Sequence, residues 1–512
     1  MRGELSWSKG NFMPRVKGFL FLKSLLIFFL FSLPSDGFPP WAVRVEEIVL
    51  SNGMKFLLYE RGEAPIFSAY IRFRAGGIEE EPGKTGIAHF LEHMAFKGTE
   101  SIGTRDFGKE KPILNEIEKV GEELAAEYGK GKKADPERIK ALRERLRSLH
   151  REEEKYLVKE ELSKRFLENG GNDQNATTSK DMTSYFISLP SDKLRFWAEL
   201  ESERIFRPVF REFYEEKDVV LEERRMRVDN DPDGRLYEAF LAAAFEKSPY
   251  HWPTIGKEED ILRLTVRDLE SFWKKYYHPS NAIGVLVGKF DREKAKGILE
   301  ETFGKISFPG EAPKKEDYPQ EPPQKSERRI VLGLKARPRI WIGYHKPTLP
   351  EPDDYLFDLL DQILGNGRSS RLYKSLVLEK KVASDVSTST GLPGSRLPNL
   401  FLIEASPIGN RSSEELLRLI DEEIEKVKKE GITEEELQKA KNRLTIDLLW
   451  RLKTNDGLAS QLSYFEIVAG SWRYLANYLE EISRFKPEEI REVAEKYLVP
   501  ANRTVAILKS SP

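Results

Sequence analysis

The sequence lacks cysteine altogether and has little histidine, and both shortages limit the chemistry that it can perform. Without cysteine the chain can form neither disulfides nor thiolate metal sites, and it offers no attachment point for the lipid of a lipoprotein. Its 512 residues include six histidines. Any metal centre must therefore be built from these few imidazoles together with carboxylates.

An excess of charge of either sign is also missing. The chain has 83 basic and 85 acidic residues and a formal net charge of −2, which gives no electrostatic basis for binding nucleic acid. Apolar residues make up 39% of the chain. At this length they suffice for several hydrophobic cores, so we expect more than one domain.

The apolar run near the amino terminus is too short to span a membrane. Arg15 and Lys17 precede the largely apolar residues 24–33, whereas a spanning helix needs about twenty apolar residues. This pattern predicts that residues 1–37 are a secretory signal and that the protein is exported to the periplasm or another extracytoplasmic location. Two alternatives remain open: residues 19–33 could stay as an uncleaved membrane anchor that tolerates Lys23, and Met13 could be the true start.

The most informative feature that is present is the pentapeptide His89-Phe90-Leu91-Glu92-His93. In a helix, histidines four residues apart lie one turn above the other on the same face, so both imidazoles can bind one metal ion. Neutral imidazoles suit Zn²⁺, and Glu92 on the same side of that turn can take a proton from a water molecule held by the metal. The spacing H-x-x-E-H is the inverzincin signature, and chance produces it in roughly one chain in a hundred of this composition.

A catalytic zinc ion needs a third protein ligand, and the segment 215–224 offers candidates. The segment is rich in helix-forming residues, and Glu216 and Glu223 are seven positions apart, so they share one face of the predicted helix. We take Glu223 as the candidate third ligand and Glu216 as a carboxylate that orients a histidine. The spacing alone fits an ordinary charged helix with ion pairs along its surface equally well.

Three segments of the chain, in the same order, resemble one known family. They are residues 49–100, which contain the pentapeptide, residues 170–190 and residues 215–232. Together they strongly resemble the catalytic domain of the insulysin, pitrilysin and mitochondrial processing peptidase superfamily, and the similarity covers most of the chain after about residue 45. The resemblance implies one zinc ion per chain and the following residues: His89, His93 and Glu223 as ligands, Glu92 as general base, Glu216 as supporting acid, and Asn175 and Ala176 on an edge strand that binds the substrate.

The resemblance also implies an α+β fold of two homologous halves. Each half is expected to be an antiparallel-rich sheet covered by helices on one face, and the two close as a clamshell over a chamber. We expect a zinc-binding catalytic half over residues 45–307 and a homologous half without zinc ligands over residues 329–512. The proline-rich, charged segment 308–328 is predicted to join them as a semi-rigid linker.

Local patterns predict individual elements within these halves. Alternating polarity predicts strands at 55–59 and 66–73, antiparallel and hinged at Ala64-Pro65, and a single strand over 175–189. That last strand could hold substrate through main-chain hydrogen bonds or be an ordinary sheet edge. In the second half the patterns predict strands at 339–344, 383–390 and 400–405, and helices at 354–364, 413–430 and 434–450.

A charged segment interrupts the first half. Residues 108–168 have a helical period and predict an inserted helical hairpin whose second arm begins at Asp135 or Pro136. We expect this insert to be a solvated support without a function of its own, and a lid or docking element is the alternative.

One departure from the family bears on function. Related proteins carry in their second half an arginine and, seven residues later, a tyrosine that bind the substrate backbone and stabilise the oxyanion. The aligned positions here are Val377 and Ser384, which cannot replace them. We therefore expect a zinc metalloendopeptidase that hydrolyses short or unfolded polypeptides and works with a homologous zinc-less subunit that supplies the missing pair. A homodimer is the alternative assembly, although it would not supply that pair, and a catalytically silent structural subunit of the same fold is the alternative function.

Overall fold

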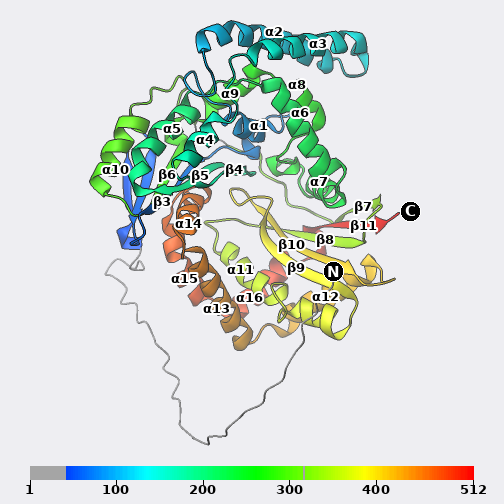
Figure 1. Cartoon of the computed structure of the whole chain (residues 1–512). Coiled ribbons are helices and arrows are strands. Elements are labelled where there is room, and N and C mark those ends of the chain that lie inside the picture. Colours follow the sequence, from blue (N-terminus) through cyan, green and yellow to red (C-terminus); the bar gives the residue numbers. More distant parts are fainter. Residues whose placement is uncertain (1–41, 315–316, 512) are drawn as a thin grey trace, which may run out of the picture.

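Two β-sheets with helices packed against them make up the described part of the chain, which is residues 42–314 and 317–511 of this computed structural model (Figure 1). The predicted α+β class is thereby confirmed. The predicted signal segment, residues 1–37, and the alternative anchor lie outside the described residues. In the described ranges no helix is both long and apolar enough to cross a membrane.

The first half is built on a six-stranded sheet in the order β1-β2-β6-β3-β5-β4. Its strands are β1 (Glu46–Val49), β2 (Lys55–Glu60), β3 (Ile66–Phe73), β4 (Asn172–Thr178), β5 (Thr183–Pro190) and β6 (Ala282–Gly288). Its helices are α1 (Ile87–Met94), α2 (Phe107–Gly129), α3 (Pro136–Glu153), α4 (Glu161–Glu168), α5 (Leu194–Phe206), α6 (Phe213–Arg224), α7 (Pro232–Ala244), α8 (Glu258–Arg263), α9 (Val266–Tyr276) and α10 (Arg292–Leu299).

The second half repeats this arrangement. Its strands follow the order β7-β11-β8-β10-β9, which matches β2-β6-β3-β5-β4 position for position. Each sheet is antiparallel apart from one parallel pair, β2 with β6 and β7 with β11, at corresponding places. The elements are β7 (Arg328–Leu334), β8 (Arg339–Lys346), β9 (Ala383–Leu392), β10 (Asn399–Pro407), β11 (Arg503–Ser510), α11 (Pro352–Leu364), α12 (Ser413–Glu430), α13 (Glu434–Arg451), α14 (Asn455–Val468), α15 (Arg473–Arg484) and α16 (Pro487–Tyr497). The shared strand order supports the prediction of two homologous halves.

Each sheet has one face covered by helices of its own half and the other face covered by a helix of the other half. On β3, Phe67 and Ile71 join the core formed with the first-half helices, whereas Tyr70 points the opposite way. Tyr70 packs in a separate core with Val285 of β6 and Leu462 of α14. A second-half helix therefore completes the first sheet, as the position of α14 beside β3 shows (Figure 1).

The second sheet is covered in the same way, by a helix of the first half. Ile342 of β8 packs with the second-half helices, and Trp341 next to it packs on the other face with Phe240 of α7, a first-half helix. Period-two alternation along β8 sends successive side chains to the two cores. The halves are thus joined by two buried apolar interfaces in addition to the linker.

The prediction of a single strand over residues 175–189 is wrong. The structure has two antiparallel strands there, β4 and β5, joined by a tight turn at residues 179–182. The Ser179 side chain accepts the N–H groups of Asp181 and Met182, and its own N–H donates to the Met182 carbonyl. The polarity pattern continues through this turn without a glycine or proline, so the sequence gives no sign of it.

The strands β2 and β3 are not neighbours, contrary to the hinged pair predicted at Ala64-Pro65. The strand β6, more than two hundred positions later in the chain, lies between them, parallel to β2 and antiparallel to β3. All seven residues of β6 are buried, as is typical of a central strand. Local alternation cannot reveal such a distant insertion.

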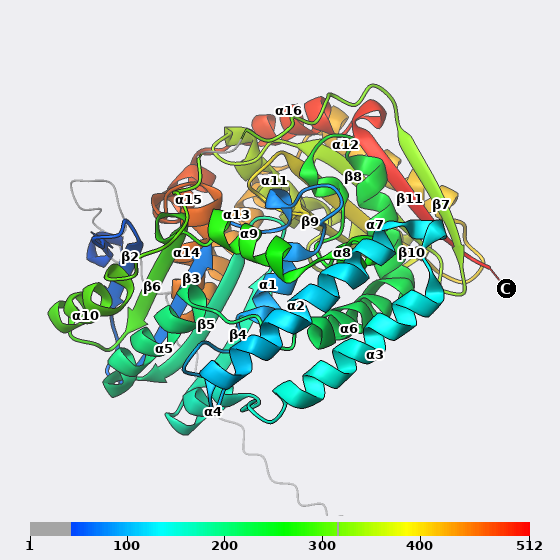
Figure 2. The same cartoon turned by 90° about the horizontal axis from the view of Figure 1, so that it is seen from above.

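The predicted helical hairpin over 108–168 consists of α2 and α3, followed by the short α4. Asp135 caps the second arm by accepting the N–H groups of Glu137 and Arg138, and Pro136 occupies the first turn, as predicted. The two long helices lie side by side across the first half, on the side away from the second half (Figures 1 and 2).

Candidate metal centre

The helix α1 carries both histidines of the pentapeptide, and a glycine sets where it begins. Gly86 has φ of +88°, a conformation that favours glycine. A Cβ atom there would lie 2.5 Å from the Ile255 carbonyl oxygen, so no larger residue fits. His89 and His93 then lie one turn apart on the same face, with their ring centroids 4.7 Å apart.

Glu223, near the end of α6, meets both imidazoles. Its Oε2 lies 3.7 Å from Nε2 of His89 and 3.5 Å from Nε2 of His93. Each of the three residues offers one ligand atom, and these atoms lie within 4.8 Å of one another. In the described part of the chain, this is the group of residues that could hold a metal ion. Two imidazole nitrogens and one carboxylate oxygen converging on one point are the ligands of a catalytic zinc site.

Glu216 holds His93 from the other side of the ring, two helical turns before Glu223. Nδ1 of His93 lies 2.7 Å from Glu216 Oε1, and Nζ of Lys97 lies 2.6 Å from Oε2 of the same carboxylate. A hydrogen bond at Nδ1 fixes the ring with Nε2 facing Glu223. Burial would raise the pKa of Glu216, but the contacts with His93 and Lys97 outweigh it and lower that pKa to about 2.

The two histidines have opposite protonation preferences without a metal. Burial and the neighbouring His93 lower the pKa of His89 to about 4, so His89 is a neutral imidazole. Burial also opposes a charge on His93, but the carboxylates of Glu216 and Glu223 outweigh it and raise the pKa of His93 to about 9. A metal at this point must displace the proton of His93, so metal binding weakens as the pH falls.

Glu92 lies next to the ligands and is held by a residue from the sheet. The Thr178 hydroxyl, at the end of β4, donates to Glu92 Oε2 at 2.5 Å. Burial raises the pKa of Glu92 above its ordinary value, which moves this carboxylate towards the range of a general base. A cavity of about 430 Å³ is lined by Glu92 and His93 and also by residues 157–163 of the insert.

The predicted substrate residues lie on the free edge of the first sheet. In the described residues β4 pairs with β5 alone, so its other edge can accept a further strand. Asn175 is exposed and Ala176 is buried. Since Thr178 ends this strand at Glu92, an extended peptide added to β4 would run towards the candidate centre.

Two family models match consecutive parts of the chain. The model described as Insulinase (Peptidase family M16) matches residues 56–129 and 154–258, and the model described as Peptidase M16 inactive domain matches residues 263–444. This chain belongs to the peptidase M16 superfamily. His89, Glu92, His93, Glu216 and Glu223 all fall in the first match, and its interruption at 130–153 covers α3 of the insert.

Relatives of similar length support this membership. The zinc protease PqqE of Helicobacter pylori is 28% identical over 500 residues, which are 96% of this chain and 99% of that protein. The crystal structure of a protease from Helicobacter pylori superposes with a TM-score of 0.75 at 27% identity, covering 91% of this chain and 99% of that one. The periplasmic protease PqqL of Escherichia coli is longer, since this chain covers 48% of it, and at 17% identity with a TM-score of 0.68 it shows the shared fold alone.

The oxyanion-binding pair expected of M16 relatives is absent at its aligned positions. Val377 packs against the second-half core, and the Ser384 hydroxyl donates to Asp385 on the same strand. Both side chains make these contacts within the second half, so neither supplies a donor to the centre.

Two residues that support the centre were missed by sequence reasoning. Lys97 lies just beyond the end of α1, four positions after His93, and this helical spacing was a usable signal. Thr178 gave no such signal, because its contact with Glu92 depends on how β4 packs against α1.

Proposed function

We propose that this chain is a zinc metalloendopeptidase that hydrolyses short or unfolded polypeptides. The observation that carries the proposal is the convergence of His89, His93 and Glu223 on one point with Glu92 beside them. A silent scaffold has no need of this arrangement, and the named relative of full length is a zinc protease. The match to an inactive domain begins at residue 263, after Glu223, and includes none of the residues that converge on this point.

The chain's own residues account for the remaining parts of the reaction. When bound, zinc would supply a Lewis acid that makes water more acidic and polarises the peptide carbonyl. Glu92 takes the proton from the attacking water and passes it to the leaving amine nitrogen. Glu216 keeps His93 in the tautomer that offers Nε2, and the edge of β4 aligns the peptide backbone through hydrogen bonds that do not depend on its side chains.

Cleavage of an unstructured fluorogenic peptide by the purified, zinc-loaded protein tests this function. Glu92→Gln should lower kcat by about 10²–10⁴-fold, the usual contribution of a general base, while one zinc ion per chain is retained. Glu222→Gln is the matched control, because Glu222 lies on the same helix as Glu223 but is exposed and pairs with Arg225. Full activity in the Glu92→Gln protein would refute the mechanism.

We propose further that full activity needs a homologous zinc-less subunit. The missing donors at Val377 and Ser384 motivate this, and PqqL, twice the length of this chain, is consistent with paired M16 units. Adding the zinc-less homologue should raise kcat by tenfold or more, since an oxyanion donor contributes about 10²–10³-fold. An unchanged rate on mixing would refute the need for a partner subunit. A protein that binds zinc but shows no activity, either alone or mixed with the homologue, would instead indicate a catalytically silent structural subunit.

We also propose export through residues 1–37, to the periplasm or an equivalent location, with retention through residues 19–33 as the alternative. Sequencing the amino terminus of the protein recovered from soluble and membrane fractions distinguishes the two outcomes.

A further inference from the structure

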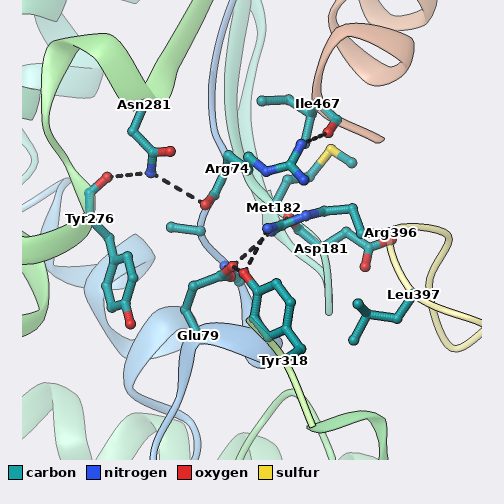
Figure 3. A network of polar contacts seen from close by, with 12 residues as sticks. Arg74, Glu79, Asp181, Met182, Tyr276, Asn281, Tyr318, Arg396, Leu397 and Ile467 are labelled. Atoms are coloured by element: carbon teal, nitrogen blue, oxygen red, sulfur yellow. Dashed lines mark hydrogen bonds and ion pairs between the residues drawn. The ribbon is translucent and has the colours of Figure 1, made fainter. Parts of the chain in front are cut away.

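A loop of the second half inserts an arginine into the first half. Residues 394–397 lie in the connection between β9 and β10, and the Arg396 side chain is 2% exposed. Its Nη1 donates to Glu79 Oε1 and to the Asp181 carbonyl oxygen, both at 2.8 Å, and its Nη2 donates to the Tyr318 hydroxyl at 2.8 Å (Figure 3).

The backbone around Arg396 is bound as closely as its side chain. The Tyr250 hydroxyl donates to Asp181 Oδ1 at 2.6 Å and accepts the N–H groups of Arg396 and Leu397 at 3.1 Å. A Cβ atom at Gly394 would lie 2.6 Å from the Asp181 carboxylate and 2.7 Å from the Tyr250 hydroxyl oxygen. The loop therefore fits into a shaped socket of the first half, and only glycine allows this approach.

Both groups that Arg396 binds in the first half belong to segments that lead to the candidate centre. Glu79 precedes Glu80, whose carboxylate accepts the Ala88 N–H in the first turn of α1 at 3.1 Å. Asp181 lies in the β4–β5 turn, three positions after Thr178, whose hydroxyl holds Glu92. The arginine thus joins the start of the ligand helix to the hairpin that contacts Glu92.

The chemistry of the contact requires a guanidinium. A buried carboxylate is tolerated when it is paired, and the Glu79 side chain is 2% exposed. The planar fork of arginine reaches a carboxylate, a carbonyl and a phenol at once, whereas the single ammonium group of lysine cannot match those directions.

We propose that Arg396 is a positioning residue, through which the half without zinc ligands holds α1 and the β4–β5 hairpin in place around Glu92. This rests on the proposed peptidase function. It assigns the second half a part in the reaction that does not need the missing arginine and tyrosine.

Kinetics of Arg396→Gln and Arg396→Lys test the proposal, with Arg503→Gln as the matched control. Arg503 is similarly buried, at 5% exposure, and pairs with Asp421 of the second half and with Glu327 at the end of the linker, away from the first half. We expect Arg396→Gln to lower kcat at least tenfold with zinc content unchanged, and Arg396→Lys to recover part of the loss. Arg503→Gln should lower Tm but leave the kcat of the folded protein close to the wild-type value.

A second measurement does not depend on activity. Because the chain has no cysteine, spin labels can be placed on cysteines introduced at exposed Thr177 of β4 and Lys429 of α12. Arg396→Gln should shift or broaden the distance distribution between these labels, and Arg503→Gln should not. A label distance and a kcat that both match the control would overturn the proposal. A wild-type protein that binds zinc yet hydrolyses no peptide, both alone and mixed with the zinc-less homologue, would refute the peptidase function, whereas the label distance would still decide whether Arg396 holds the hairpin.

Discussion

Three carboxylates at the candidate centre have different neighbours, and the proposed function gives each a different task. Glu223 faces two imidazole Nε2 atoms, Glu216 is held between His93 and Lys97, and Glu92 accepts one hydroxyl. A cationic neighbour keeps Glu216 ionised, whereas burial favours the protonated form of Glu92. Under the proposed function, the same residue type therefore provides a metal ligand, an orienting group and a general base.

Thr178→Val is expected to change the pH dependence of hydrolysis. Burial raises the pKa of Glu92, and the hydrogen bond from Thr178 opposes that rise. Without the bond the pKa of Glu92 rises further, so the base stays protonated to a higher pH. The acid limb of the profile of kcat/KM against pH should move upwards by about half a pH unit to one pH unit.

Thr177→Val, an exposed change on the same strand, is the control for this shift. An acid limb that stays in place in Thr178→Val would show that the hydroxyl does not act on the base.

At the scale of secondary structure, the inserted hairpin is attached to α6, the helix that carries Glu223. His150 of α3 lies between two carboxylates, with Nδ1 2.9 Å from Glu153 and Nε2 2.7 Å from Glu215 of α6. An exposed ion pair joins Arg143 to Asp218 along the same helices. His150 is thus a buried structural histidine, and the insert braces α6 from outside.

His150→Gln is expected to destabilise the protein in a pH-dependent way. Burial would lower the pKa of His150, but the two carboxylates outweigh it and raise the pKa to about 9. The stabilisation is then fully present below about pH 6.5, the unfolded value, and is lost as the pH rises through 9. Urea unfolding should show a loss of about 1–3 kcal/mol at pH 6 and a smaller loss at pH 9.5.

Arg143→Ala is the control, because its exposed ion pair should contribute less than about 1 kcal/mol. Equal losses from His150→Gln at both pH values would contradict the assignment of the charge to His150.

At the scale of the whole molecule, each half supplies a helix that covers the sheet of the other half, α7 from the first half and α14 from the second. The two halves therefore depend on each other for their apolar cores. The sheet face that bears Tyr70 and Val285 is covered by α14, and the face that bears Trp341 is covered by α7. Removing the second half would therefore expose a large apolar face on the first half.

Residues 45–307 produced alone are expected to bind the dye ANS and to unfold without a cooperative transition. Producing them together with residues 329–512 should restore a single transition, because α14 is then supplied in trans. If the fragment 45–307 is monomeric and unfolds cooperatively, its fold does not need the helix α14 of the second half.

Patterns with local causes were predictable from the sequence. The helix over 413–430 and the strand over 66–73 have the predicted bounds, and Asp135 caps the second arm of the insert. The spacing within α1 places His89 and His93 on one face, because the helix has a fixed 3.6-residue period. Membership of the M16 superfamily likewise followed from short segments that retain their order.

Only the tertiary structure revealed the features that depend on contacts between segments far apart in the chain. It separated β2 from β3 by inserting β6, turned residues 175–189 into a hairpin, and brought Thr178 to Glu92 and Arg396 to Glu79. It also placed Glu223 against both histidines, across about 130 intervening positions for which spacing left the ligand undecided. The physical reason is that periodicity and capping act over a few residues, whereas these contacts arise only when sheets and helices pack into shared cores.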